Sequence, residues 1–410
     1  MNNKELLVSL DIGTTKIRVI IGEVNNGAIN IIGVGSTDSA GIKKGAIVDI
    51  DETVQSIRKA VDHAERMVGV EVTHVYVGIS GNHIALQSSH GVVAVSSEDR
   101  EIGQEDIDRV IQASKVIALP PERSIIDVVP KQFLVDGLGG INDPRGMIGV
   151  RLEVEATIVT GAKTIIHNLL RCVERANLVI DGLILMPLAA SYISLSKDEK
   201  NLGVVCADIG AGATTIAIYE QGILVATTVL PIGGEYITND ISIGLRTQTS
   251  VAEQIKLKYG CALISTASDD VKFKVPRIGS NVEKEFSQYD LASIIEPRVQ
   301  EMIHLIQQEV LRLGYGPEIA GGYVLSGGVV SMPGVLQVAQ VQLDSAVRIA
   351  TPEFIGVRDP SYTSGVGMIQ YAYKNQIRRS QDVQTTKTKR KPVKGPGAME
   401  KVKNWLSEFI

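Results

Sequence analysis

Aromatic residues are scarce in this chain. They make up 4% of its 410 residues, although the hydrophobic fraction as a whole is 44%. The core must therefore consist mostly of Ile, Val, Leu and Ala, a composition typical of strands buried between helices. A chain of this length is also too long for one ordinary hydrophobic core, so we expect two or more domains.

Cysteine and histidine are rare as well. The three cysteines, Cys172, Cys206 and Cys261, form no Cys-x-x-Cys pair, and we interpret them as reduced packing residues of a cytosolic protein. The six histidines show no metal-ligand spacing. These absences argue against a disulfide framework and against a histidine metal site.

Long apolar runs are missing too. No run reaches the length of a transmembrane helix, and Met1–Glu5 leads into a predicted strand with no signal-peptide pattern. The net charge is −5, yet residues 374–410 hold ten Lys or Arg and three Asp or Glu, which gives +7 there and −12 for residues 1–373. An acidic body with a basic end argues against nucleic acid as a partner. It favours an anionic surface that meets the basic end alone.

Two similar segments stand in the two halves of the chain. Residues 7–16 read LVSLDIGTTK and residues 203–215 read GVVCADIGAGATT. Each is an apolar strand that ends in aspartate and is followed by a glycine turn with hydroxyl residues. Such a turn brings backbone N–H groups close to phosphate oxygens, and threonine adds further donors. Either copy alone could be an ordinary strand and turn, but the pair favours two halves that close on one phosphorylated ligand.

The candidate residues of these two loops share this chemistry. They are Asp11, Gly13, Thr14, Thr15 and Lys16 in the first loop, and Asp208, Gly210, Gly212, Thr214 and Thr215 in the second. Carboxylates at the ends of buried strands need a cation, so Asp11 and Asp208 are the candidate ligands of Mg²⁺, through water. Lys16 either offsets phosphate charge or lies just outside the site.

Local patterns predict the elements around these loops. The strand pattern recurs in two hairpins, at 6–10, 16–23 and 28–34 and again at 203–209, 213–220 and 223–231. Helical spacing of apolar residues predicts helices at 51–68, capped by Asp51, and at 104–116, 163–176, 235–244, 250–259 and 293–313. Further short strands are predicted at 91–95, 124–129, 132–135 and 152–158.

A third motif, Leu325-Ser326-Gly327-Gly328, follows a strand and permits close backbone approach to a ligand. The three motifs in this order resemble the actin, Hsp70 and sugar-kinase ATPase superfamily, and nearly the whole chain resembles the FtsA family of bacterial cell-division proteins. The resemblance implies ATP and Mg²⁺ as ligands. It adds Glu253, Lys256, Gly327 and Gly328 near the adenosine, and Gly233 and Gly234 in the segment after the second loop.

The resemblance also implies a fold. It is an α/β, actin-like two-lobed fold of duplicated ribonuclease-H-like halves, with an FtsA-type inserted α+β subdomain and a C-terminal amphipathic helix. The implied parts are subdomain 1A (1–83, 164–195 and 358–373), the inserted subdomain 1C (84–163), subdomain 2A (196–245 and 320–357), subdomain 2B (246–319), a flexible basic linker (374–398) and a membrane-targeting helix (399–410).

One position departs from the superfamily pattern. Many of these ATPases carry a carboxylate or glutamine beside a Pro-x-Ala-Ala segment, where it orients the attacking water, but here Met186 precedes Pro187. Methionine neither accepts a proton nor positions water. We therefore expect ATP binding with weak or negligible hydrolysis. No catalytic residue is assigned, and Asp208 is left as the one candidate.

The final segment has an amphipathic pattern. At 100° per residue its apolar side chains fall within an arc of about 140°. They are Met399, Val402, Trp405, Leu406, Phe409 and Ile410. This pattern suits a helix in the interface of an anionic membrane, and docking of that helix on the body or on another subunit is the alternative. So short an anchor binds weakly alone, which favours a polymerising body.

The resemblance names the partners. It implies binding of the C-terminal peptide of FtsZ at Arg298 and Glu301, within the sequence EPRVQE, self-assembly into an actin-like protofilament, and further divisome proteins at subdomain 1C. From the sequence alone, Arg298 and Glu301 form an ordinary exposed ion pair of a helix. The implied function is a tether of FtsZ filaments at the cytoplasmic face of the membrane, at the division septum. The alternatives are a small-molecule kinase of the superfamily and the pilus-assembly protein PilM.

Overall fold

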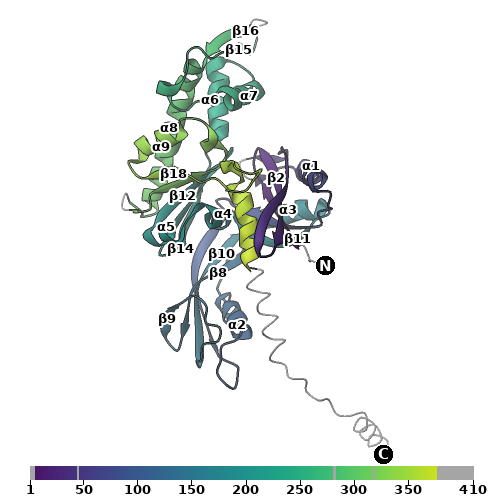
Figure 1. The fold of residues 1–410 in the computed structure, drawn as a ribbon, viewed down its shortest axis with the longest axis vertical. Coiled ribbons are helices and arrows are strands. Elements are labelled where there is room, and N and C mark those ends of the chain that lie inside the picture. The colour runs from purple at the N-terminus through teal and green to yellow at the C-terminus, as the bar shows by residue number, and fades with distance from the viewer. Residues whose placement is uncertain (1–4, 44–45, 280–282, 317–318, 376–410) are drawn as a thin grey trace, which may run out of the picture. The chain divides into compact units, whose positions relative to one another are not determined.

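The computed structural model describes residues 5–43, 46–279, 283–316 and 319–375. The chain divides into two units, 1–371 and 372–410, and the elements below belong to the first (Figure 1). The predicted helix at 399–410 and residues 376–398 of the predicted linker lie outside the described residues, whereas residues 374 and 375, predicted as linker, are helical. None of the helices that the structure describes is long and apolar enough to cross a membrane.

The first half is built on a five-stranded sheet. Its strands are β1 (Glu5–Ile12), β2 (Lys16–Asn25), β3 (Ala28–Asp38), β6 (His74–Ile79) and β11 (Val179–Leu185). Their order is β11-β6-β1-β2-β3, with antiparallel pairing along the hairpins and parallel pairing of β1 with β6 and of β6 with β11. Apolar residues on both faces of β1 and β2 are buried, so this sheet is covered on both sides.

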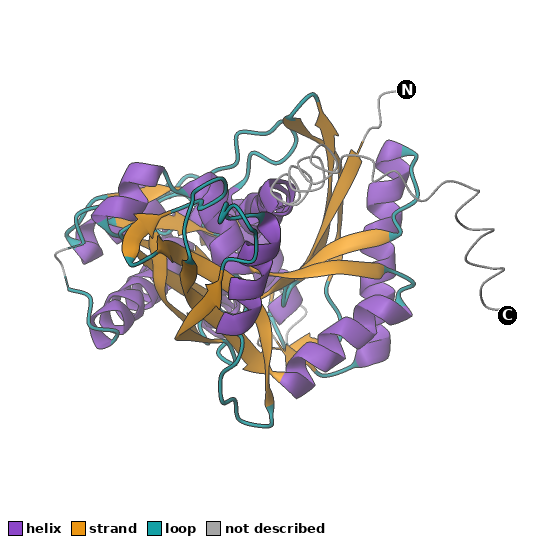
Figure 2. Ribbon diagram, turned by 90° about the horizontal axis from the view of Figure 1, so that it is seen from below, coloured by secondary structure: helices purple, strands orange, loops and turns teal. Residues whose placement is uncertain are grey.

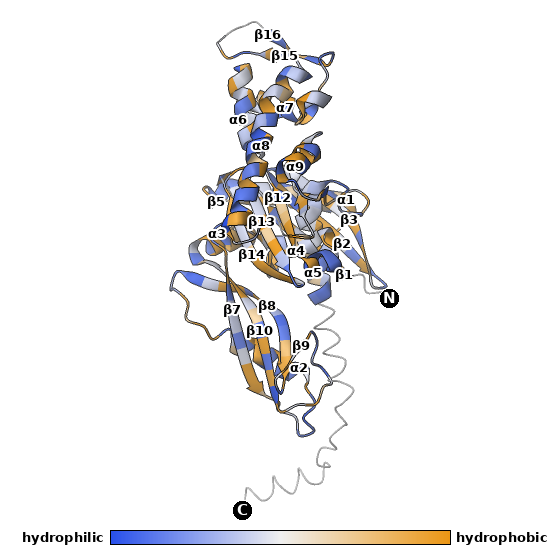
Figure 3. Ribbon diagram, turned by 90° about the vertical axis from the view of Figure 1, so that its left-hand side faces the viewer, coloured by the Kyte–Doolittle hydropathy of each residue, from blue (hydrophilic) through white to orange (hydrophobic). Residues whose placement is uncertain are grey.

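The second half repeats the same sheet. Its strands are β12 (Val204–Ile209), β13 (Thr214–Glu220), β14 (Ile223–Leu230), β17 (Tyr323–Ser326) and β18 (Val347–Ile349). Their order, β14-β13-β12-β17-β18, has antiparallel pairs in the hairpins and parallel pairs beyond them, as in the first sheet. Figure 3 shows hydrophobic residues along β12, β13 and β14. The predicted duplication is therefore confirmed.

Helices pack along these sheets (Figure 2). In the first half they are α1 (Ile50–Val68), α3 (Lys163–Arg175) and α4 (Met186–Ser194), with a small hairpin of β4 (Ile42–Lys43) and β5 (Ala46–Ile47), and α5 (Lys197–Leu202) follows at the start of the second half, where it contacts β13. The predicted capping residue of α1 was wrong. Asp49 is its N-cap, and its side chain accepts a hydrogen bond from Glu52 N at 3.0 Å. Asp51 lies in the first turn, where it pairs with Arg175 at 2.5 Å.

Longer helices characterise the second half. They are α6 (Gly234–Leu245), α7 (Thr249–Tyr259), α8 (Gln288–Arg312) and α9 (Val335–Leu343), with three short turns, η1 (Ile264–Thr266), η2 (Gly328–Ser331) and η3 (Pro360–Tyr362), and a hairpin of β15 (Lys272–Pro276) and β16 (Glu283–Ser287). Helix α8 begins five residues earlier than predicted. The reason is a capping box in which Ser287 and Asp290 each bond the other's backbone N–H.

The inserted segment forms its own sheet with one helix. It contains β7 (Ala85–Ala94), α2 (Gln104–Ser114), β8 (Arg123–Val135), β9 (Leu138–Ile141) and β10 (Arg151–Ala162), in the order β7-β10-β8-β9. The two strands predicted at 124–129 and 132–135 are one strand, β8. Pro130 stands where the register with β10 shifts, so a bulge accommodates the missing backbone donor.

Candidate functional site

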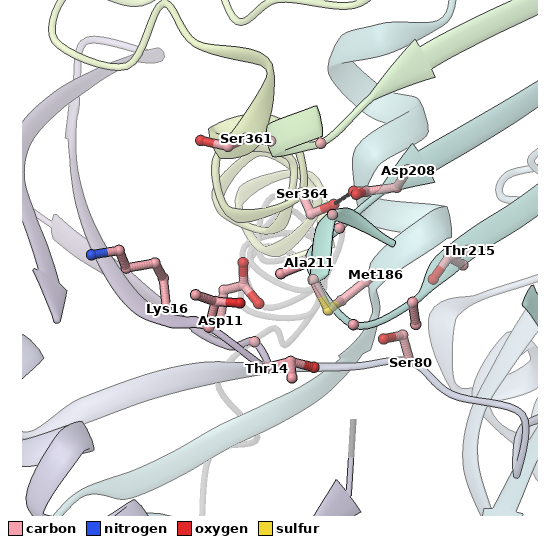
Figure 4. A pocket seen from close by; sticks show the side chains of 18 of the residues that line it. Asp11, Thr14, Lys16, Ser80, Met186, Asp208, Ala211, Thr215, Ser361 and Ser364 are labelled. Carbon is pink, nitrogen blue, oxygen red and sulfur yellow. Dashed lines mark hydrogen bonds between the residues drawn. The ribbon is translucent and has the colours of Figure 1, made fainter. Parts of the chain in front are cut away.

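Loops from both halves line one cavity of about 500 Å³. Fourteen of the sixteen residues predicted at the nucleotide line it: Asp11, Gly13, Thr14, Thr15, Lys16, Asp208, Gly210, Gly212, Thr215, Gly234, Glu253, Lys256, Gly327 and Gly328. Figure 4 shows side chains of both loops around this cavity. The pattern of two aspartate-glycine loops in the sequence therefore marks a cavity of the folded chain.

The two loops have the same local structure. Gly13 N donates to Lys16 O at 3.1 Å, and Gly210 N donates to Ala213 O at 3.0 Å. Each turn thus closes on the residue three positions later, directly after a buried strand. This shared turn leaves the following backbone N–H groups and hydroxyls at the edge of the sheet, where they line the cavity.

The loops of the two halves also touch each other. A Cβ atom added at Gly212 would lie 2.7 Å from Thr14 Oγ1 and 3.0 Å from Thr14 Cβ. Only glycine fits so close to the opposite loop. The structure therefore has the two halves closed around the cavity.

Two desolvated carboxylates face this cavity. Asp11 is 7% exposed, and burial raises its pKa from 3.8 to about 6; nearby Arg18 opposes this shift, and Asp208 adds to it. Burial also raises the pKa of Asp208, while a hydrogen bond from Ser364 Oγ at 2.8 Å and the charge of Arg18 lower it. Buried carboxylates without a counter-charge are costly.

These groups fit a hydrated Mg²⁺ ion and phosphate. Asp11 and Asp208 supply hard oxygen ligands from opposite halves, a donor set that suits Mg²⁺ with retained waters. Thr15 Oγ1 is buried and has no hydrogen-bond partner among the described residues. A ligand with acceptor oxygens would satisfy this hydroxyl.

The basic residue that faces the carboxylates is Arg18, which sequence reasoning missed. Lys16 Nζ instead pairs with Asp38 Oδ1 at 2.5 Å, and its side chain is directed away from Asp208 (Figure 4). Arg18 stands opposite Asp11 in the register of β1 and β2, and its guanidinium lies 5.3 Å from the centre of the Tyr362 ring. The sequence did contain a signal for Arg18. In a strand, residues 16 and 18 point to the same face, so Arg18 could have been considered together with Lys16.

The other end of the cavity has a connected set of polar contacts. Lys256 Nζ donates to Gly234 O at 3.1 Å and to Thr238 Oγ1 at 2.8 Å, and it pairs with Glu253 Oε2 at 2.7 Å. These contacts join α7 to the start of α6. Gly327, with a φ of +93°, passes so close to the second loop that a Cβ would lie 2.6 Å from Asp208 Oδ1.

Two predicted residues do not line the cavity. Thr214 is fully buried, and its hydroxyl donates to Ile232 O at 2.8 Å. Gly233 packs beneath the second loop, where a Cβ would lie 2.4 Å from Ala211 O. Thr214 and Gly233 therefore support the shape of the second loop and do not face the cavity.

The wall formed by the start of α4 is apolar. Met186, Pro187 and Ala190 line it. Among the described residues that line the cavity, the carboxylates are Asp11, Asp208 and Glu253, and the last is held by Lys256 and Thr238. A water-orienting side chain is therefore missing from this wall.

The predicted peptide-binding residues lie on α8. Arg298 donates to Asp240 Oδ2 at 2.5 Å and to Asp240 Oδ1 at 3.1 Å, pairs with Glu301, and lies over the ring of Tyr236 at 5.8 Å. Its side chain is 23% exposed. Arg298 thus belongs to a network with residues of α6. The sequence alone predicted only an exposed ion pair with Glu301.

Comparison with known proteins identifies the family. The model described as cell division protein FtsA matches residues 205–367, and the model of the SHS2 domain inserted in FtsA matches residues 81–160. The chain is 55% identical over 375 residues to cell division protein FtsA of Bacillus subtilis, covering 92% of this chain and 85% of that one. It is 39% identical over 409 residues to cell division protein FtsA of Pseudomonas aeruginosa, covering 98% and 97%.

Solved structures show the actin-like fold. A type IV pilus biogenesis complex of PilM and PilN matches with a TM-score of 0.62 at 16% identity, over 90% of this chain and 98% of that one. An MreB protein of Spiroplasma citri, solved with ADP, matches with a TM-score of 0.55 at 14% identity, over 91% and 98%. The sequence relatives are far more similar, and they decide the family. The chain belongs to the FtsA family of cell division proteins.

Proposed function

We propose that this cell-division protein binds Mg·ATP between its two halves, polymerises in that state, and tethers FtsZ filaments to the cytoplasmic face of the membrane at the septum. The observation that supports the nucleotide site most directly is the cavity with one aspartate and one glycine turn from each half, closed by the contact of Gly212 with Thr14. The MreB protein of similar fold was solved with bound ADP, which agrees with a nucleotide at this place.

Each side chain has a distinct task in this proposal. The N–H groups of both turns and the free Thr15 hydroxyl bind phosphate oxygens, and Arg18 adds a positive charge near them. Asp11 and Asp208 hold the waters of the metal ion. Bound Mg²⁺ would supply the positive charge that two carboxylates and a polyphosphate require. Lys256, Glu253 and Gly327 surround the adenosine end.

Hydrolysis is slow in this proposal because the start of α4 brings Met186 and Pro187 to the cavity, and neither a carboxylate nor a glutamine. Met186 and Pro187 cannot take a proton from water. ATP therefore acts mainly as a ligand that holds the two halves together. Brisk phosphate release by the purified protein that disappears in Asp208→Ala would contradict this view.

Closing of the two loops can be tested with a matched pair of variants. We expect Gly212→Ala to weaken Mg·ATP binding by about tenfold or more, because the new Cβ separates the loops. The double variant Thr14→Ala, Gly212→Ala removes the two closest atoms, Thr14 Oγ1 and Cγ2, keeps Thr14 Cβ at 3.0 Å, and should regain part of this affinity over Gly212→Ala alone. Calorimetric titration measures both. Equal affinity of Gly212→Ala and wild type would show that binding does not need this contact.

The proposed site for the FtsZ peptide is the surface around Arg298 and Glu301. We expect Arg298→Glu to weaken binding of a C-terminal FtsZ peptide by about tenfold or more, since it reverses the charge that faces the peptide. Arg312→Glu is the control, because Arg312 makes a similar pair with Glu309 on the same helix. Fluorescence anisotropy measures affinity, and circular dichroism confirms folding. Unchanged affinity of a folded Arg298→Glu would exclude this residue.

A further inference from the structure

The last helix of the first unit begins at the candidate nucleotide site. Residues 363–371 are helical and follow η3. Ser364 Oγ donates to Asp208 Oδ2 at 2.8 Å, and Pro360 O accepts from Gly327 N at 3.2 Å. A shift of Asp208 on binding a metal therefore acts on this helix directly.

The first half holds this helix tightly. A Cβ added at Gly365 would lie 2.6 Å from Ile20 Cδ1 of β2, and one added at Gly367 would lie 2.3 Å from Ala189 O of α4. Ser9 Oγ of β1 also donates to Gly365 O at 2.9 Å. The helix packs so closely that it cannot move without displacing α4 or the first sheet.

The other end of the helix contacts the inserted subdomain. Tyr371 Oη donates to Asp127 Oδ2 of β8 at 2.9 Å, and its ring meets Tyr192 of α4 edge-on, with centroids 5.3 Å apart. Figure 1 shows this helix, in yellow, reaching from the loops of the cavity toward β8 and β10. Two turns of helix thus join Asp208 to the root of the inserted subdomain.

A second set of contacts leads back to the cavity through α4. Lys200 Nζ lies 5.2 Å from the ring centre of Tyr192 and 5.3 Å from that of Tyr219. Tyr219 Oη donates to Pro187 O at 3.0 Å, and Pro187 lines the cavity. The rings of Tyr192 and Tyr219 therefore lie between Pro187, which lines the cavity, and Tyr371.

We propose that Ser364 and Tyr371 are positioning residues two turns apart on one helix, through which the nucleotide site and the inserted subdomain are coupled. This inference rests on the proposed nucleotide binding. The Tyr371–Asp127 hydrogen bond occurs here together with closed loops, and the proposal assigns it to the closed conformation. A bond that stabilises the binding-competent state raises affinity, and the ligand strengthens that bond in return.

The test uses residues that do not line the cavity. Mg·ATP affinity of the full-length protein is measured by calorimetry for wild type, Tyr371→Phe, Asp127→Ala and the double variant, since alanine leaves no acceptor for the Tyr371 hydroxyl. We expect each single variant to weaken binding by about fivefold or more, and the double variant to be no weaker than the singles, because all three remove one link. Tyr373→Phe is the control for loss of a tyrosine hydroxyl and should bind as wild type does.

A second readout excludes a merely structural effect. Hydrogen exchange of residues 123–129 in β8 is compared with and without saturating Mg·ATP. We expect protection by Mg·ATP in wild type and at least a halving of that protection in Tyr371→Phe. If wild type binds Mg·ATP and the variants bind it with the same affinity and show the same protection, the coupling is overturned and the proposed function is not. A wild-type chain that does not bind Mg·ATP would overturn the coupling and the proposed function together.

Discussion

Replacing Asp11 with asparagine is expected to stabilise the nucleotide-free protein and to weaken Mg·ATP binding by about 10- to 100-fold, the usual cost of losing a group that holds a metal's water. The first effect follows from burial. Asp11 has a pKa of about 6 in the fold against 3.8 for the exposed group, which corresponds to roughly 3 kcal/mol of unfavourable interaction at neutral pH. Asparagine removes the charge and keeps the shape.

The gain in stability should depend on pH. Because the folded-state pKa of Asp11 is raised, the folded protein binds this proton more tightly than the unfolded chain does. The contribution of Asp11 to stability therefore falls as pH rises from 3.8 to about 6 and stays low above that range. Urea unfolding should show a difference in unfolding free energy between Asp11→Asn and wild type at neutral pH that shrinks as the solution is acidified toward the lower end of this range.

A matched control separates burial from a general effect of lost charge. Asp62→Asn removes an exposed carboxylate on α1 and should change unfolding free energy by less than about 0.5 kcal/mol and leave Mg·ATP binding intact. If Asp11→Asn is less stable than wild type at neutral pH, the charged Asp11 carboxylate does not destabilise the nucleotide-free protein. If it also binds Mg·ATP normally, Asp11 is not a metal residue.

The fold could be predicted well from local patterns because the sheets follow local rules. The hairpins 6–34 and 203–231 need only alternating strands and short turns, and the repeated aspartate-glycine loops mark the carboxyl ends of equivalent strands. The long strand β8 was missed because Pro130 normally ends a strand. Only its pairing with β10 shows that a bulge accommodates it.

The site was predictable where one short segment supplies it and hidden where distant segments meet. Ser364 bonds Asp208 across 156 residues, and no local pattern marks that serine. The sequence left open whether Lys16 offsets phosphate charge or lies just outside the site. In the structure Lys16 pairs with Asp38 on the neighbouring strand β3, and Arg18 faces the carboxylates. The partner on the neighbouring strand decides which basic residue faces the site, and that partner is known only once the register of the sheet is known.

Removal of residues 399–410 is expected to abolish binding to anionic vesicles in the presence of Mg·ATP. The segment lies outside the described residues, so the expectation rests on its sequence pattern. Its six apolar residues bury into the interface, and the lysines before it meet anionic lipid. In a sedimentation assay the full chain should pellet with vesicles that contain phosphatidylglycerol and remain in solution with neutral ones. Residues 1–398 should remain in solution with both.

Two substitutions of equal charge test the predicted face of this helix. Leu406→Lys puts a cation in the apolar arc and should remove binding, whereas Asn404→Lys puts it on the polar side and should retain or strengthen binding. Equal binding of the two variants would rule out a helix that lies in the interface with this face. Vesicle binding by residues 1–398 would rule out the tether altogether.

The strength of this binding should depend on the nucleotide site, although the tail itself does not contain it. A single short helix binds weakly, and many helices in one polymer gain roughly 100-fold or more in apparent affinity without any new contact. Asp11→Asn keeps the whole tail but binds Mg·ATP more weakly, so at an ATP concentration that saturates wild type and not the variant it should sediment with vesicles as weakly as a monomer does. If Asp11→Asn sediments as strongly as wild type under the same conditions, the tail anchors monomers, and ATP-dependent assembly is not what holds the protein at the membrane.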